Sequence, residues 1–142
     1  MRISQVLRAK GSAVATIEPT ATVRELLVEL AEHNVGALVV LGRDGLAGIV
    51  SERDVVRRLP ERGAALLDDP VSEIMTQAVT TCTPQDTVDA LTVLMTERRI
   101  RHVPVIADGQ LCGIVSIGDI VKSRITQLEL NQRQLQDYIT QG

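Results

Sequence analysis

Hydrophobic and polar positions follow the same order twice along this chain. A shift of 65 positions superimposes residues 14–57 on residues 79–122 without a gap. The matching pairs include glycines such as Gly48 and Gly113, as well as prolines, capping residues and apolar positions. Self-similarity that preserves turns and apolar positions together indicates two copies of one structural unit.

Each copy is predicted to run strand, helix, strand, strand, helix. In the first copy, a short apolar run at residues 15–17 ends before Pro19, which cannot donate a ladder hydrogen bond. Thr22 and Glu25 then have the spacing of a capping box, which marks a helix start. Apolar residues recur at the three- and four-residue intervals of one helix face: Val23, Leu26, Leu27 and Leu30. The second copy repeats the strand at residues 79–82.

Two apolar runs with an Asp-Gly pair between them follow the helix of each copy. Asp-Gly favours a tight hairpin turn because these residues tolerate positive φ. The four expected strands are residues 37–41, 46–50, 102–106 and 111–115. Ser51 and Ser116 come directly after the hairpins and are expected to begin second helices.

A lead-in precedes each copy, and a connector joins the copies. Residues 3–7 resemble residues 71–75. Residues 58–78 are expected to form a structured connector in which regular secondary structure is interrupted at residues 60–63. The predicted division is 1–68 for the first repeat, 69–126 for the second and 127–142 for an extension. A domain of about 60 residues buries only about 60% of its surface, so we expect the two repeats to share one core.

The C-terminal segment departs from the repeat and is predicted to continue as a long helix. Its apolar positions alternate at intervals of four and three residues: Val121, Ile125, Leu128, Leu135 and Ile139, with Gln132 in the gap. Two interpretations remain open for this seam. The helix folds back onto its own domain, or it pairs with a second copy of the chain.

Composition and charge exclude several classes of protein. The net charge is −3 with Lys and Arg scattered among Asp and Glu, which argues against nucleic-acid and anionic-membrane binding. No apolar run approaches the roughly 18 residues of a membrane span, and the N-terminal segment lacks the apolar core of a signal peptide. We therefore expect a cytoplasmic protein. Cys82 and Cys112 lie in apolar runs typical of core positions, and Tyr138 is the only aromatic residue.

Catalytic motifs are absent from the sequence. His33 and His102 are the only histidines, and no metal-ligand spacing, nucleophile motif or glycine-rich phosphate loop occurs. We therefore expect no enzymatic activity.

The motif Gly-Ile-Val-Ser-x-x-Asp is the one candidate for chemistry, and it occurs at residues 48–54 and 113–119. One interpretation is a capping box, in which Ser and Asp satisfy amides at a helix start. The other is a ligand site, because helix amides and a hydroxyl favour phosphate and a carboxylate can accept both hydroxyls of a ribose. Arg53 adds a cation beside the first motif. His102 is either a phosphate contact or a packed neutral histidine.

These motifs, with Val-Pro-Val at 103–105 and Ser-Glu-Ile-Met-Thr at 72–76, resemble tandem cystathionine β-synthase (CBS) domains, also called a Bateman module. The resemblance implies an α/β fold in which two β-α-β-β-α repeats pack about a pseudo-twofold axis. It also implies two clefts that often bind adenosine nucleotides such as AMP, ATP or NAD.

The resemblance further implies roles for individual residues. Ribose hydroxyls would lie at Asp54 and Asp119, phosphate at Ser51 and Ser116, and the base beside Thr16, Ile17, Thr81 and Cys82. Arg101 and His102 match the basic pair that such domains place before a hydrophobic-Pro-Val strand, here with Pro104, to meet phosphate.

The first copy departs from that pattern, because Gly36 and Ala37 replace the basic pair. Its phosphate contacts would come from Arg53 or from the other half of the chain. The second copy has residues 117–118, Ile-Gly, where the first has Glu-Arg. The two clefts should therefore differ in ligand or affinity.

The chain resembles small stand-alone bacterial proteins of this type. We expect a non-catalytic homodimer that senses energy or redox state through an adenosine nucleotide and modulates an unidentified protein partner. The alternative is a constitutive interaction or dimerisation module whose clefts are vestigial.

Overall fold

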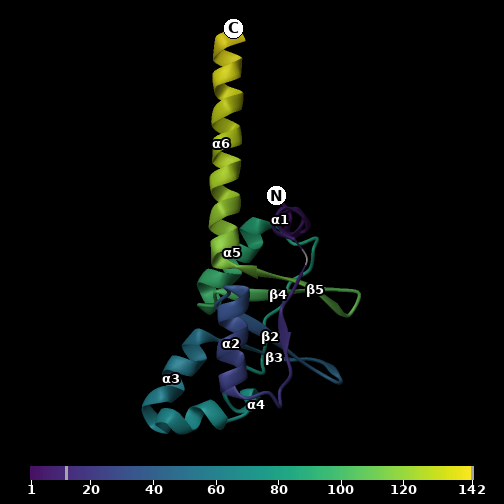
Figure 1. Cartoon of the computed structure of the whole chain (residues 1–142). Helices are drawn as coiled ribbons and strands as arrows, with labels where there is room; N and C mark the ends of the chain where they lie inside the picture. Colours follow the sequence, from purple (N-terminus) through teal and green to yellow (C-terminus); the bar gives the residue numbers. More distant parts are fainter. Residues whose placement is uncertain (12, 142) are drawn as a thin grey trace.

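The computed structural model describes residues 1–11 and 13–141 as two similar α/β repeats and a projecting helix (Figure 1). The elements in chain order are α1 (Ile3–Lys10), β1 (Thr16–Ile17), α2 (Val23–His33), β2 (Ala37–Gly42), β3 (Gly45–Ser51), α3 (Glu52–Arg62), the 3₁₀ helix η1 (Gly63–Asp68), α4 (Val71–Ile74), α5 (Val88–Arg98), β4 (His102–Ala107), β5 (Gln110–Ser116) and α6 (Ile117–Gln141). The expected α/β fold with two repeats and a C-terminal helix is confirmed.

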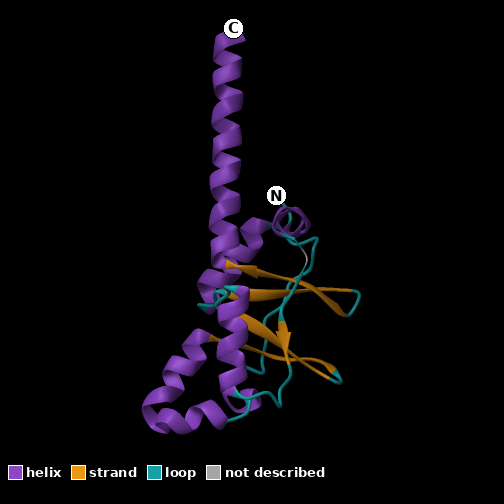
Figure 2. Ribbon diagram, in the orientation of Figure 1, coloured by secondary structure: helices purple, strands orange, loops and turns teal. Residues whose placement is uncertain are grey.

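The two sheets repeat one pairing scheme (Figure 2). In the first repeat, β1 runs parallel to β2 and β2 runs antiparallel to β3, with Ile17 beside Val40. In the second, β4 and β5 form the hairpin, and the predicted strand at residues 79–82 is reduced to one parallel bridge between Cys82 and Val105. The bridge occupies the position that Ile17 and Val40 occupy in the first repeat.

The lead-in of each repeat packs against the other repeat. Leu7 of α1 lies over β5, where a Cβ added at Gly113 would stand 2.6 Å from its Cδ2 atom. Met75, just after α4, lies over β3, where a Cβ at Gly48 would stand 2.9 Å from its Sδ atom and 2.6 Å from the Thr76 carbonyl oxygen. The paired glycines therefore leave room for the exchanged lead-ins.

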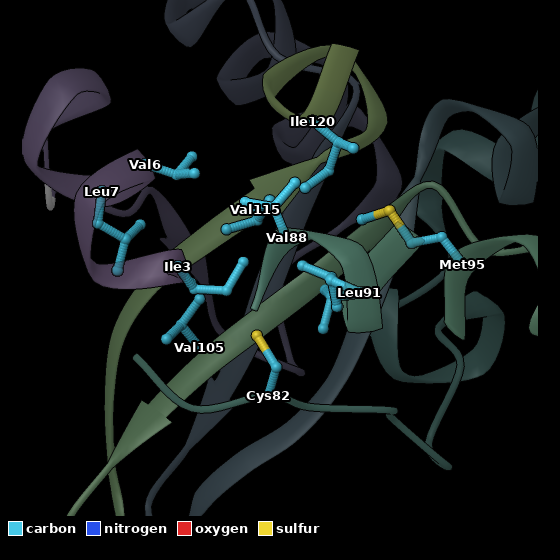
Figure 3. Close-up of a cluster of buried hydrophobic side chains, with 11 residues drawn as sticks. Ile3, Val6, Leu7, Cys82, Val88, Leu91, Met95, Val105, Val115 and Ile120 are labelled. Atoms are coloured by element: carbon cyan, nitrogen blue, oxygen red, sulfur yellow. The ribbon is translucent and has the colours of Figure 1, made fainter. Parts of the chain in front are cut away.

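This exchange produces two hydrophobic cores, so the expectation of one shared core is wrong. The first core contains Ile17, Val23, Leu26, Leu30, Leu38, Val40, Val50, Val55, Leu66, Val71 and Ile74. The second contains Ile3, Val6, Leu7, Cys82, Val88, Leu91, Met95, Val103, Val105, Val115 and Ile120 (Figure 3). Each repeat completes its core with apolar residues from the other repeat's lead-in. Helix α1 supplies Ile3, Val6 and Leu7 to the second core, and α4 supplies Val71 and Ile74 to the first.

Two details of the first repeat bear on the predicted pattern. The Thr22 hydroxyl caps α2 by accepting a hydrogen bond from the Glu25 amide at 3.2 Å. On this helix Leu27 is 37% exposed, so it does not belong to the buried face. The break expected at residues 60–63 falls at the end of that range, because α3 continues through Pro60 to Arg62 and is capped by Gly63 with φ of 57°. A proline so near a helix end removes only one late hydrogen bond.

Helix α6 extends away from both sheets (Figure 1). Its 25 residues correspond to a length of about 38 Å, and every described residue from 127 onward is exposed. The interpretation in which this segment folds back onto its own domain is therefore wrong. The seam remains uncovered on a single chain, with Leu128 at 66% and Ile139 at 74% exposure.

Candidate functional site

A cleft of about 530 Å³ lies between the two repeats. Its walls are the start of α3 in the first repeat, residues 76–80 after α4, and residues 99–102 before β4 in the second repeat. Small-molecule sites commonly have volumes of 300–1,000 Å³, so the cleft is large enough for a nucleotide-sized ligand.

The capping-box interpretation of the first motif is confirmed. The Asp54 Oδ2 atom accepts hydrogen bonds from the Ser51 amide at 2.8 Å and from the Ser51 hydroxyl at 3.2 Å. The Ser51 Oγ atom in turn accepts from the Asp54 amide at 3.4 Å. Both side chains are only half-buried and line the cleft. The cap therefore holds a carboxylate and a hydroxyl in fixed positions at the helix start.

Four exposed arginines also line the cleft: Arg53, Arg57, Arg99 and Arg101. Among the described residues on its wall, only Glu52 and Asp54 are acidic. Within residues 1–11 and 13–141, none of the four arginines forms an ion pair. The chain as a whole carries a net charge of −3, so this concentration of positive charge is local and favours an anionic ligand.

His102 faces the cleft at the start of β4 and is half-buried. Burial lowers the pKa of His102, and the nearby Lys10 and Arg101 lower it further against the opposing effects of Asp119 and Glu52. The imidazole is therefore neutral near pH 7. A Cβ added at Gly36 would lie 3.7 Å from its Cε1 and Nε2 atoms, so the small residue in the first repeat leaves space beside the ring.

The second motif has the same cap but different surroundings. The Asp119 Oδ2 atom accepts from the Ser116 amide at 2.9 Å and hydroxyl at 3.0 Å, and also from the Lys10 Nζ atom at 2.6 Å. Burial raises the pKa of Asp119, but the hydrogen bonds from Lys10 and Ser116 outweigh burial and hold it below its ordinary value. Lys10 and Asp119 border a smaller cavity of about 310 Å³ between α1 and α6.

Besides Ser116 and Asp119 of the second motif, five predicted contact residues do not line the 530 Å³ cleft: Thr16, Ile17, Thr81, Cys82 and Pro104. Ile17 and Cys82 are buried in the two cores, and burial raises the pKa of the Cys82 thiol to about 12. Pro104 is buried, and its carbonyl oxygen accepts from the Cys82 amide at 3.0 Å. Contacts between these five residues and a ligand remain predictions.

The wall expected from residues 81–82 is formed instead by Ala78, Val79 and Thr80. Sequence reasoning missed them because Ala78 ends the predicted connector and Val79 and Thr80 begin the predicted strand, one to three residues before the expected contacts. Arg57 and Arg99 were not among the expected contact residues either, and Arg99 reaches the cleft from a left-handed helix cap with φ of 54°. The signal available in the sequence was the density of arginine just after the first motif and just before the second hairpin.

Among the described residues, no helix combines the length and apolar character that crossing a bilayer requires. Nor does the described part of the chain group three or more His, Cys, Asp or Glu side chains as a metal site.

Comparison with known proteins shows a consistent match. The profile of the CBS domain matches residues 10–61 and 71–125. A mitochondrial CBS domain-containing protein of Arabidopsis thaliana is 36% identical over 99% of this chain and 72% of its own length.

Solved structures of CBS-domain proteins have the same fold as this chain. A CBS-domain protein from Agrobacterium tumefaciens has a TM-score of 0.84 and 43% identity, covering 87% of this chain and 92% of its own. A CBS domain protein from Pyrobaculum aerophilum complexed with AMP has a TM-score of 0.78 and 34% identity, and the match covers 93% of this chain and 99% of its own. With its duplicated fold and the two profile matches, the chain belongs to the CBS domain family as a tandem pair of CBS domains.

Proposed function

We propose that this chain is a non-catalytic regulatory module that binds an adenosine nucleotide, of the AMP, ATP or NAD class, in the 530 Å³ cleft. The observation that carries the proposal is the presence, around one cleft, of a fixed carboxylate and hydroxyl on Asp54 and Ser51 and of four arginines that form no ion pair with any described residue. A nucleotide combines the two chemistries that these groups recognise, ribose hydroxyls and phosphate.

Each part of such a ligand has a matching wall. The α3 amides, the arginines and the Ser51 hydroxyl suit phosphate, because a helix start favours anions. The Asp54 carboxylate suits the ribose hydroxyls. The base would pack against aliphatic side chains such as Ile49, Val79 and Ile100, since the lining includes no aromatic residue. The AMP complex of the Pyrobaculum relative supports this ligand class.

The expected affinity is micromolar. AMP has about 23 non-hydrogen atoms, and about 0.3 kcal/mol per atom gives about 7 kcal/mol, or a Kd of about 10 μM. Such a value suits a module that responds to cellular nucleotide levels. In this proposal, the ligand state alters the activity of a protein partner and so reports energy or redox state.

We also propose that the protein is a homodimer, joined at least in part through α6. The five apolar seam residues on this helix are between 52% and 74% exposed: Val121, Ile125, Leu128, Leu135 and Ile139. Soluble proteins seldom leave a continuous apolar stripe of this kind open to water. The same seam favours a second candidate function, a constitutive dimerisation module with vestigial clefts.

A cytoplasmic location is part of the proposal. Cys82 and Cys112 are free, which fits a reducing compartment. The mitochondrial Arabidopsis relative shows that the family is not confined to the cytoplasm.

The proposed function is tested by measuring the Tm with AMP, ATP, NAD and S-adenosylmethionine. The protein is first unfolded and refolded to remove any ligand bound during expression. A ligand at 100 times its Kd adds about 2.7 kcal/mol per site, which raises the Tm of a chain of this length by roughly 5–10 °C. Flat curves for every nucleotide would exclude the sensor and leave the dimerisation module as the remaining candidate.

A further inference from the structure

The two lead-ins place different side chains beside the two motif carboxylates. The lead-ins align at a shift of 68, which pairs Leu7 with Met75, and the structure confirms this alignment because both residues cover equivalent glycines. The same shift pairs Lys10 with Ala78. Ala78 lines the 530 Å³ cleft, whereas Lys10 carries an ammonium group into the equivalent place of the second repeat.

The Lys10 ammonium is held by two acceptors. Its Nζ atom donates to the Asp119 Oδ2 atom at 2.6 Å and to the Ile114 carbonyl oxygen at 2.7 Å. The Lys10 and Asp119 side chains are 31% and 20% exposed, so water screens this pair only in part. The residues are 109 positions apart in sequence and meet because α1 packs on the second repeat.

The matching carboxylate in the first repeat has no such partner. Among the described residues, the Asp54 side chain accepts hydrogen bonds only from Ser51. No ion pair in the described part of the chain involves Asp54. Its carboxylate is therefore available to a ligand, while that of Asp119 is already neutralised.

We propose that Lys10 determines where the nucleotide binds: its ammonium occupies the Asp119 carboxylate, so the chain binds one adenosine nucleotide in the 530 Å³ cleft beside Asp54 (the first cleft) and disfavours a second one beside Asp119 (the second cleft). This inference rests on the proposed function. A ribose would have to displace a charge-assisted hydrogen bond before it could use Asp119.

The neighbouring residues reinforce this difference. Gly118 in the second repeat stands where Arg53 adjoins Asp54 in the first, so the second helix start lacks an adjacent arginine for phosphate. A nucleotide entering the second cleft would lose its ribose acceptor and one phosphate contact. We expect its affinity there to be roughly 10- to 100-fold weaker than in the first cleft.

Native mass spectrometry with AMP and ATP counts the nucleotides bound per chain and tests this proposal. We expect one for the wild type and two for Lys10→Ala and Lys10→Met, with one retained in Lys10→Arg because arginine restores the cation. Arg8→Ala removes a positive charge from the same helix and should bind one. Thermal melts of each variant without ligand verify that it is folded.

Calorimetry in an Asp54→Ala background weakens the first cleft, so that the second cleft contributes more of the measured binding. Adding Lys10→Ala there should tighten the residual nucleotide binding by roughly 10- to 100-fold. Two nucleotides on the wild type, or one on Lys10→Ala, would overturn the proposal while leaving the sensor function intact. Weaker binding on Lys10→Ala would instead make Lys10 a phosphate ligand. Absence of binding by every variant would overturn the proposed function and this inference together.

Discussion

Replacing Asp54 by alanine separates the capping role of this carboxylate from a role in binding a ligand. Asp54 accepts two hydrogen bonds from Ser51, at 2.8 and 3.2 Å, so its loss removes half of a capping box. A lost cap costs about 1 kcal/mol, which lowers the Tm of a chain of this length by about 4 °C. A ribose acceptor adds a second effect, because hydrogen bonds to a charged group are worth about 1.5–3 kcal/mol.

The combined expectation for Asp54→Ala is a modest loss of stability and a loss of nucleotide affinity of about 10- to 150-fold. Titration calorimetry measures the affinity, and urea denaturation measures the free energy of unfolding. Asp54→Asn sharpens the test, because the amide oxygen of asparagine can still accept from the Ser51 amide but the side chain carries no charge. It should keep near wild-type stability and still bind less tightly.

Two further variants provide matched controls for this prediction. Asp44→Ala removes a carboxylate from the exposed hairpin loop between β2 and β3 and should change neither quantity. Asp119→Ala removes the equivalent cap in the second repeat and should lower stability without weakening the first site. Unchanged nucleotide affinity in Asp54→Ala, together with reduced stability, would refute the ribose assignment and leave the carboxylate as a cap only.

Three other predictions follow from the structure. Deleting residues 127–141 removes most of the exposed seam and should yield monomers by light scattering at micromolar concentration; an unchanged dimer would assign the interface to the two repeats. Burial holds the folded-state pKa of His102 below its unfolded value of 6.5, so the unfolded chain binds more protons and stability is lost as the pH falls through 6.5 towards the folded-state pKa. His102→Gln should therefore lose less stability between pH 7.5 and 5.5 in urea titrations than the wild type, and identical losses would contradict the assignment. Gly48→Ala should cost about 1–3 kcal/mol, because its Cβ would stand 2.6 Å from the Thr76 carbonyl oxygen, which belongs to the backbone. Gly113→Ala meets only a flexible leucine side chain and should cost less; the reverse order in denaturant titrations would show that the lead-ins are packed differently.

The sequence by itself determined the features that depend on local pattern. The 65-residue repeat, the hairpins at their Asp-Gly turns and the two capping boxes follow from side-chain spacing and backbone preference, which act over a few residues. The long C-terminal helix could be predicted for the same reason. Ser51, Arg53, Asp54, Arg101 and His102 were candidates from their motifs, and the structure brings all five to one cleft.

Only the tertiary structure decided the features that depend on contacts between distant segments. The exchange of lead-ins replaces one shared core by two, because each repeat completes its core with residues from the other repeat's lead-in, such as Leu7 on the second repeat. It also places Ala78, which follows α4, on the cleft wall. The pairing of Lys10 with Asp119 has no local signature, since no spacing rule links residues that meet only through packing.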